Sequence, residues 1–302
     1  MHDNPLPLGS NDVDMKRFLS YIIPLAVVGA MCLSCSSLQR VINTSDNELI
    51  FRRGLVYYNA GKWTKAILLF EHCEPFLKGL PQEDSVAYYR AHSYFKNYDY
   101  HTSATLFDEF RRNYGRSVFI EPAEAMYAIS LYNMCPSPER DQTTTAAAII
   151  AISEFMSHHP NSEQIGYFEE MTHDLTWRME ERSFINAYTY YKILRYDSAI
   201  IAFRNALKKY PDSHRREDIM YYIVMSAYKF ADNSIAAKQA DRFMSALDYY
   251  YSFVMEYPES TYREELDRLA ESAKRYIEKH KTEKVEDDGN VADAAAIRGV
   301  AN

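Results

Sequence analysis

The chain has few of the residues that break helices or build covalent frameworks. Its 302 residues include nine glycines, eleven prolines and four cysteines, against 26 tyrosines and 47% apolar residues. Cys32 and Cys35 lie in an N-terminal export region, so only Cys73 and Cys135 remain and a disulfide framework is excluded. The low glycine content favours a large helical body. Cys73 and Cys135 are expected as small buried hydrophobic residues, with a bridge between them in an oxidising compartment as the alternative.

Basic charge and catalytic motifs are also lacking. The formal net charge is -8, so the body has no basic field that would attract nucleic acid. The sequence contains no G-x-S-x-G, phosphate-loop or H-E-x-x-H pattern. His158 and His159 stand before Pro160, where interaction with a helix end explains them better than metal binding. We therefore expect no enzymatic activity, no metal and no cofactor apart from a covalent lipid.

That lipid is indicated by the N-terminal region. Lys16 and Arg17 precede an apolar run over residues 18–31, and Ser34 offers a small side chain before Cys35. This order is typical of an export signal that is cleaved before a lipid-modified cysteine. The run is too short to span a bilayer well, although an uncleaved membrane anchor remains the alternative.

The segments around the body follow from this assignment. Residues 15–34 are predicted as the signal peptide, Cys35 as the lipidation site and residues 35–46 as a tether. Residues 1–14 carry no export signal and are expected to be a disordered extension or a misassigned start. Residues 282–302 form an acidic tail rich in Asp, Glu, Gly and Ala, which offers no apolar face to bury and is expected to be disordered. Because residues 36–40 contain no acid, we expect a lipid-anchored protein with its body facing the periplasm.

The body consists of repeats with tetratricopeptide spacing. Residues 47–161 hold three copies, and residues 162–281 hold a long linking helix followed by two more. Copies three and five are longer, and residues 136–143 and 232–240 have the composition of the extra loops. The copy that fits without adjustment predicts that Tyr190, Ala199 and Phe203 meet in the core. The small residues of the five first helices are Gly54, Ala91, Ala128, Ala187 and Met225.

A recurring end signature supports this register. Pro or Gly stops each helix, and a serine caps the next one. A single helix pair cannot bury its apolar face, whereas stacked pairs can. The predicted fold is therefore an all-α α-solenoid of about five tetratricopeptide-like helix pairs, with one long linking helix between residues 162 and 194. The four signatures are Tyr114-Gly-Arg-Ser117, His159-Pro-Asn-Ser162, Tyr210-Pro-Asp-Ser213 and Tyr257-Pro-Glu-Ser260.

Together, the lipidated start, five helix pairs, overlong helix and Tyr-Pro-acid-Ser ends resemble the BamD family, the outer-membrane lipoproteins of the β-barrel assembly machinery. The resemblance spans roughly residues 35–281, and its most specific part is residues 178–213. The insertions in copies three and five and the tyrosine excess depart from the family. The resemblance implies a scaffold that binds the barrel insertase, a BamA-like protein, and unfolded outer-membrane barrel proteins with an aromatic C-terminal signal.

Four positions on each first helix would line the concave face of such a solenoid. An aromatic face with amide and basic groups suits an extended apolar peptide, although each ring could instead belong to the core. In repeat three these positions are Ala125, Ile129, Tyr132 and Asn133. The predicted peptide-binding residues in repeats one and two are Phe51, Leu55, Tyr58, Asn59, Tyr88, His92, Phe95 and Lys96.

The resemblance also places the insertase contact on the C-terminal half. Arg215 and Arg216 follow the Ser213 cap, so they are candidates for partner binding, with a solvated helix start as the alternative. Two other functions stay open at this point. One is a general tetratricopeptide adaptor of the envelope for motility or secretion. The other is a SusD-like glycan-binding lipoprotein, which the tyrosines favour and the scarcity of glycine and tryptophan disfavours.

Overall fold

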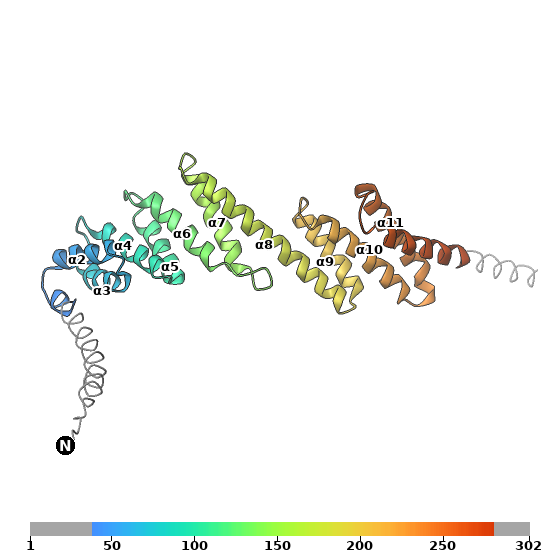
Figure 1. Cartoon of the computed structure of the whole chain (residues 1–302), viewed down its shortest axis with the longest axis horizontal. Helices are drawn as coiled ribbons and strands as arrows, with labels where there is room; N and C mark the ends of the chain where they lie inside the picture. Colours follow the sequence, from blue (N-terminus) through green and yellow to red (C-terminus); the bar gives the residue numbers. More distant parts are fainter. Residues whose placement is uncertain (1–37, 281–302) are drawn as a thin grey trace, which may run out of the picture. The chain divides into compact units, whose positions relative to one another are not determined.

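The computed structural model describes residues 38–280, and its regular elements within that range are all helical. The signal peptide, Cys35, the N-terminal extension and the acidic tail predicted from sequence lie outside the described residues. Residues 38–42 are helical, and a last helix covers residues 263–280. Between them come α2 (Asn47–Asn59), α3 (Trp63–Cys73), the short 3-10 helix η1 (Glu74–Phe76), α4 (Glu83–Lys96), α5 (Tyr100–Asn113), α6 (Ile120–Met134), α7 (Thr143–His158), α8 (Ile165–Lys192), α9 (Tyr196–Lys209), α10 (Arg216–Asp232) and α11 (Ala236–Glu256) (Figure 1).

The chain divides into two compact units. Within the described residues, unit 1 comprises residues 38–134 and 151–159, and unit 2 comprises residues 135–150 and 160–280. In unit 1, α2 packs on α3, α3 on α4, α4 on α5 and α5 on α6. In unit 2, α8 packs on α9, α9 on α10 and α10 on α11. Within each unit these successive helices thus pack on one another, which is the packing expected of a solenoid.

The repeat register predicted from sequence is confirmed by burial. The small residues of the five first helices are all buried. So are the partner positions on the second helices, where a small residue is followed four positions later by a ring or an aliphatic side chain. These pairs are Ala66 and Phe70, Ser103 and Phe107, Ala148 and Ile152, Ala199 and Phe203, and Ala246 and Tyr250.

The end signatures fold into turns that tie each repeat to the one before. Ser117 Oγ accepts the N–H of Phe119 at 3.1 Å and donates to Asp84 Oδ2 at 2.7 Å. Ser213 Oγ does the same, accepting from the Arg215 N–H at 3.2 Å and donating to Glu180 Oε2 at 3.0 Å. The serine therefore caps the turn before the helix and also binds a carboxylate 33 residues earlier.

Two sequence-based expectations about local structure were wrong. The predicted loop over residues 232–240 ends at Ile235, because the alanine-rich stretch that follows forms the first turn of α11. Tyr190 is exposed rather than packed on Ala199 and Phe203. Its neighbours Tyr188 and Tyr191 pack against that core cluster instead. The predicted linking helix is confirmed as the 28-residue α8, whose C-terminal part is also the first helix of repeat four.

The two cysteines of the described residues form no disulfide; Cys73 is buried and Cys135 is half-buried. Burial raises the pKa of the Cys73 thiol to about 12, so it behaves as a small apolar side chain. Between residues 38 and 280, none of the helices combines the length and apolar character needed to cross a bilayer.

Candidate functional site

Unit 1 carries a row of half-buried rings on the first helices of repeats one and two. Tyr58 lies on α2, and Tyr88, His92 and Phe95 lie at helical spacing on α4. The His92 ring centroid is 5.5 Å from Tyr58, 6.0 Å from Tyr88 and 6.3 Å from Phe95. We call these four residues the aromatic row. Half of the predicted peptide-binding set is thus brought together on one surface.

A hydrogen bond between Tyr58 and His92 defines the chemistry of this row. The Tyr58 hydroxyl oxygen lies 2.7 Å from His92 Nδ1. Burial raises the pKa of Tyr58 to about 12, while burial and the nearby charge of Lys96 lower the pKa of His92 to about 4. At neutral pH both groups are therefore neutral, and in the tautomer in which the phenol donates to Nδ1 the ring proton lies on Nε2. Among the described residues this N–H has no acceptor, so it is available to a ligand.

Polar side chains lie at the C-terminal ends of the same two helices. Asn59 is the last residue of α2 and Lys96 the last residue of α4, and both are exposed. Lys96 is close enough for its charge to lower the pKa of His92. The row therefore combines rings with an amide, an ammonium group and an imidazole N–H, which together can bind an apolar side chain beside a carboxylate or peptide carbonyl.

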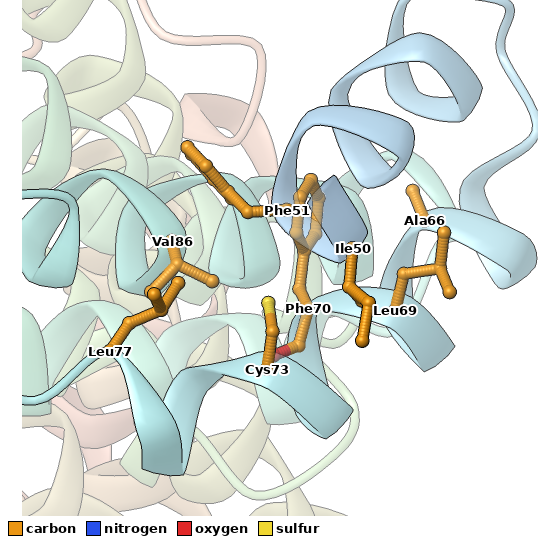
Figure 2. Packing of buried hydrophobic residues seen from close by; sticks show 8 residues of the cluster. All are labelled: Ile50, Phe51, Ala66, Leu69, Phe70, Cys73, Leu77 and Val86. Carbon is orange, nitrogen blue, oxygen red and sulfur yellow. The ribbon is translucent and has the colours of Figure 1, made fainter. Parts of the chain in front are cut away.

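Phe51 does not belong to this surface. Only 6% of it is exposed, and its ring centroid lies 5.9 Å from that of the fully buried Phe70. Figure 2 shows both among the eight residues of the first core cluster. Leu55 is half-buried and packs against the same cluster. The spacing rule selected Phe51 because it ignores α3, whose Phe70 covers this position.

Two rings that the sequence analysis missed extend the row. The centroids of Tyr89 and Trp63 lie 5.0 and 5.4 Å from that of Tyr58, and each ring meets Tyr58 edge-on. Tyr89 adjoins Tyr88 in sequence, and its ring also contacts Phe70 at 6.4 Å. The adjacent pair Tyr88 and Tyr89 could have indicated this, because two consecutive rings on a packed helix can both reach neighbouring helices.

Repeat three continues the surface with less aromatic character. Ala125 is buried in the core, whereas Ile129 and Tyr132 are half-buried. Asn133 is exposed, but its side-chain amide donates to the Ile129 carbonyl at 2.7 Å. The polar character predicted for this position is therefore partly used within the helix.

Unit 2 has its own cluster of rings at equivalent positions. The offsets that selected Tyr88, His92 and Phe95 from Ala91 select Phe184, Tyr188 and Tyr191 when counted from Ala187. In the structure Tyr188 stacks on Phe184 at 5.7 Å and on Tyr191 at 5.9 Å. Tyr222 of α10 covers all three at 4.9 to 5.9 Å. These rings were missed only because the rule was applied to the first three repeats.

The two arginines predicted to bind a partner form ion pairs within unit 2. Arg215 Nε donates to Glu181 Oε1 at 2.6 Å, and its Nη1 lies 2.8 Å from Asp218 Oδ2. Arg216 pairs with Glu256 of α11. Burial would favour the protonated form of Glu181, yet hydrogen bonds from Arg215 and His214 hold its pKa below the usual value. Arg215 thus neutralises a buried carboxylate at the junction of α8 and α10.

The described residues show no catalytic or metal-binding arrangement. No group of three or more His, Cys, Asp or Glu side chains among them is placed to hold a metal ion. The histidines with carboxylate partners, His158, His159 and His214, bind Glu124, Glu180 and Glu181 at repeat junctions.

Comparison with known proteins identifies two matching families. Residues 43–183 match the YfiO family model, described as outer membrane lipoprotein. Residues 187–213 match a tetratricopeptide repeat model. No curated protein sequence matches the chain.

Among solved structures, three tetratricopeptide proteins overlap with the chain. A repeat protein from Bacteroides fragilis is 16% identical and covers 78% of this chain and 100% of its own, with a TM-score of 0.36. The TPR2AB domain of yeast Sti1, in a pHSP90 complex, is 14% identical over 76% and 98%, with a TM-score of 0.35. A Thermus thermophilus protein is 16% identical over 76% and 98%, with a TM-score of 0.31. Scores this low say nothing about function.

Proposed function

Since the chain belongs to the BamD-like YfiO family of outer membrane lipoproteins, with a tetratricopeptide repeat after the family domain, we propose that it is a scaffold of outer-membrane β-barrel assembly. Unit 1 binds the aromatic C-terminal segment of an unfolded barrel protein. Unit 2 contacts the barrel insertase, a BamA-like protein. The chain is anchored by a lipid on Cys35, faces the periplasm and acts by binding rather than by catalysis.

The observation that supports client binding most directly is the aromatic row with its free imidazole N–H. A terminal phenylalanine ring of a client packs among the rings of Tyr58, Tyr88 and Phe95. Its carboxylate accepts from His92 Nε2 and pairs with the exposed Lys96 ammonium group. Asn59 supplies an amide to the main chain of the peptide. Charge-assisted hydrogen bonds of this kind are the stronger ones, and an extended peptide bound through pockets and side-chain donors is a recurrent mode of recognition.

The proposed insertase contact rests on the family match, and the ion pairs of unit 2 support a contact beside Arg215 and Arg216 rather than through them. Because Arg215 and Arg216 are paired within the chain, they maintain the surface of unit 2 rather than offering free charge. The exposed residues around them are better candidates for direct contact. Trp177 is one, since its ring stacks on His214 at 5.7 Å and is partly open to solvent.

Client binding is tested with a peptide that ends in phenylalanine, measured by calorimetry on the full chain. Removing the Phe95 ring by Phe95→Ala should weaken binding by tenfold or more, because truncating a central ring of a binding site typically costs about 2 kcal/mol. The Tyr167→Ala variant is the control, since it removes an exposed ring of α8 in unit 2. An amidated peptide should bind weakly to the unchanged protein, because it lacks the carboxylate for Lys96.

Thermal melts separate this proposal from a purely structural role of the rings. If Phe95→Ala keeps full peptide affinity and instead lowers the melting temperature, the ring belongs to the core and the client site lies elsewhere. Affinity purification from detergent-solubilised outer membrane tests the wider function. Copurification of an insertase supports it, whereas copurification of a sugar importer would favour the glycan-binding alternative.

The anchor is tested independently. The Cys35→Ala variant should leave the membrane fraction or retain its signal peptide uncut. A variant that is processed and still sediments with outer membrane after a salt wash would contradict lipid anchoring at Cys35.

A further inference from the structure

The α4–α5 turn in unit 1 and the α8–α9 turn in unit 2 each hold a bulky residue, Tyr98 and Leu194, where the backbone favours glycine; only the second is aliphatic. In the α2–α3 turn this position is Gly61, with φ of +70° and its N–H donating to the Tyr58 carbonyl at 3.0 Å. In the α8–α9 turn the position is Leu194, with φ of +62° and its N–H donating to the Tyr191 carbonyl at 3.0 Å. A residue with a Cβ is disfavoured in this left-handed region by about 1 to 2 kcal/mol.

Packing does not compensate for this strain. Leu194 is 68% exposed, and its neighbour Ile193 is 59% exposed. Two large aliphatic side chains at the tip of a turn, one of them on an unfavourable backbone, contribute little to the stability of the fold. Residues held in sparsely populated conformations commonly have a role beyond stability.

A second apolar tip lies at the same end of the unit. Helices α8 and α10 each run toward this end and are followed by the antiparallel α9 and α11, so the α8–α9 and α10–α11 turns share an edge. Both turns lie along the lower edge of unit 2 in Figure 1. The α10–α11 turn presents Ile235, which is 67% exposed. Hereafter the apolar tips are Ile193, Leu194 and Ile235.

Cationic side chains flank both tips. Lys192 and Arg195 enclose the first, and Lys238 follows the second by three residues; all three are exposed. Asp197 and Asp232 are also at this end, so the cations are in modest excess. Neither Arg195 nor Lys238 is in an ion pair with any residue between 38 and 280. Aliphatic residues framed by long basic side chains fit the boundary of an anionic bilayer, where the stems lie among the acyl chains and the charges reach the headgroups.

We propose that the apolar tips of unit 2 insert into the interface of an anionic lipid bilayer and so hold this unit against the membrane. A bilayer fits better than a protein partner because two separate, protruding tips with the same composition meet a flat, deformable surface equally well. Each tip contributes only weak binding. The inference rests on the proposed lipid anchor for its significance, because tethering at Cys35 raises the effective concentration of the membrane surface.

The first test measures vesicle binding by the mature chain that starts at residue 36, which has neither the signal peptide nor the lipid. Vesicles of phosphatidylethanolamine and phosphatidylglycerol should bind it, and vesicles of phosphatidylcholine alone should bind it at least fivefold more weakly. Adding Leu194→Gly should reduce binding to the anionic vesicles at least threefold. The same change relieves the backbone strain, so the melting temperature should stay equal or rise, which excludes unfolding as the cause.

The matched control is Met255→Ser, which removes an exposed aliphatic side chain from the C-terminal end of α11, at the opposite edge of the unit. It should leave vesicle binding unchanged. Equal losses for Met255→Ser and Leu194→Gly, or unchanged binding for Leu194→Gly, would overturn the proposal. The proposal would also be overturned if the Leu194→Gly variant lost a copurifying envelope protein but kept its vesicle binding, because the tip would then be a protein contact.

Depth is tested with Trp in place of Leu194 and vesicles that carry brominated acyl chains. The bromines should quench the tryptophan fluorescence of the Leu194→Trp variant more strongly than that of an Asp212→Trp variant, whose new ring lies in the opposite α9–α10 turn. Trp63 and Trp177 give both proteins the same background. Equal quenching would contradict insertion. Because these assays use neither the client peptide nor lipid on Cys35, their failure is distinguishable from failure of the proposed function.

Discussion

Gly54 is predicted to reject even a methyl group, unlike the alanines at the same position in other repeats. A Cβ at Gly54 would lie 2.5 Å from Phe70 Cε1 and 2.8 Å from Cδ1. The Phe70 ring cannot move aside easily, because it is fully buried between Phe51 and Tyr89. Overpacking of this kind costs about 1 to 3 kcal/mol. Alanine gains about 0.5 to 1 kcal/mol over glycine within a helix, so Gly54→Ala should destabilise unit 1 by about 1 to 2 kcal/mol.

The assay is urea denaturation followed by fluorescence, together with amide hydrogen exchange of α2 and α3. Gly166→Ala is the matched control, because its Cβ would meet nothing within 4 Å and the variant should be as stable as the unchanged protein or slightly more so. The smaller side chain of Phe70→Leu should reduce the effect of Gly54→Ala when the two are combined. Full stability of Gly54→Ala would refute the close approach of α2 and α3.

Three further changes test other parts of the molecule. Phe203→Ala deletes a fully buried ring of unit 2 and should lower the free energy of unfolding by about 3 to 5 kcal/mol; an unchanged melting temperature would show the register to be wrong. Arg215→Gln should lower the free energy of unfolding by about 2 to 3 kcal/mol, because it leaves the buried Glu181 short of a charged partner. Arg216→Gln breaks a more exposed pair and should lower it by under about 1 kcal/mol in the same denaturation series. Since the pKa of His92 falls to about 4 on folding, the unfolded state binds more protons between about pH 6.5 and 4, and stability should be lost as the pH falls through that window. The His92→Gln variant should lose less stability over the same window. An identical pH profile for the variant and the unchanged protein would contradict a neutral His92.

The fold could be predicted because the repeat has an internal spacing that the sequence states several times. The paired positions at Ala199 and Phe203 are buried as expected, and the Tyr-Pro-acid-Ser signature marks real turns. The spacing does not report which neighbour covers a ring. Phe51 is buried because Phe70 reaches it from α3. Tyr190 is exposed because Tyr188 and Tyr191, rather than Tyr190, face the core cluster of unit 2. Both outcomes depend on the angle between packed helices, which periodicity leaves open.

The candidate site was predicted in outline for similar reasons. Offsets along one helix are enough to place Tyr88, His92 and Phe95 on one face. They do not reveal the hydrogen bond from Tyr58, which requires α2 and α4 to approach, and hence they do not reveal the tautomer of His92. The polar character of Arg215 was predicted, whereas its pairing with Glu181 joins residues 34 positions apart and needed the fold.

The length of α8 has a consequence for how the protein can be divided. The YfiO match ends at residue 183 and the tetratricopeptide match begins at residue 187, yet both points lie inside one continuous helix. A shortened gene ending at the family boundary would cut α8 and strip Ala187 from the side of Phe203. Recombination that exchanged the family domain for another would have to carry the whole helix with it. A division of the chain that keeps every helix whole therefore has to fall in a turn. The turns nearest to the family boundary are at Pro160 and Leu194.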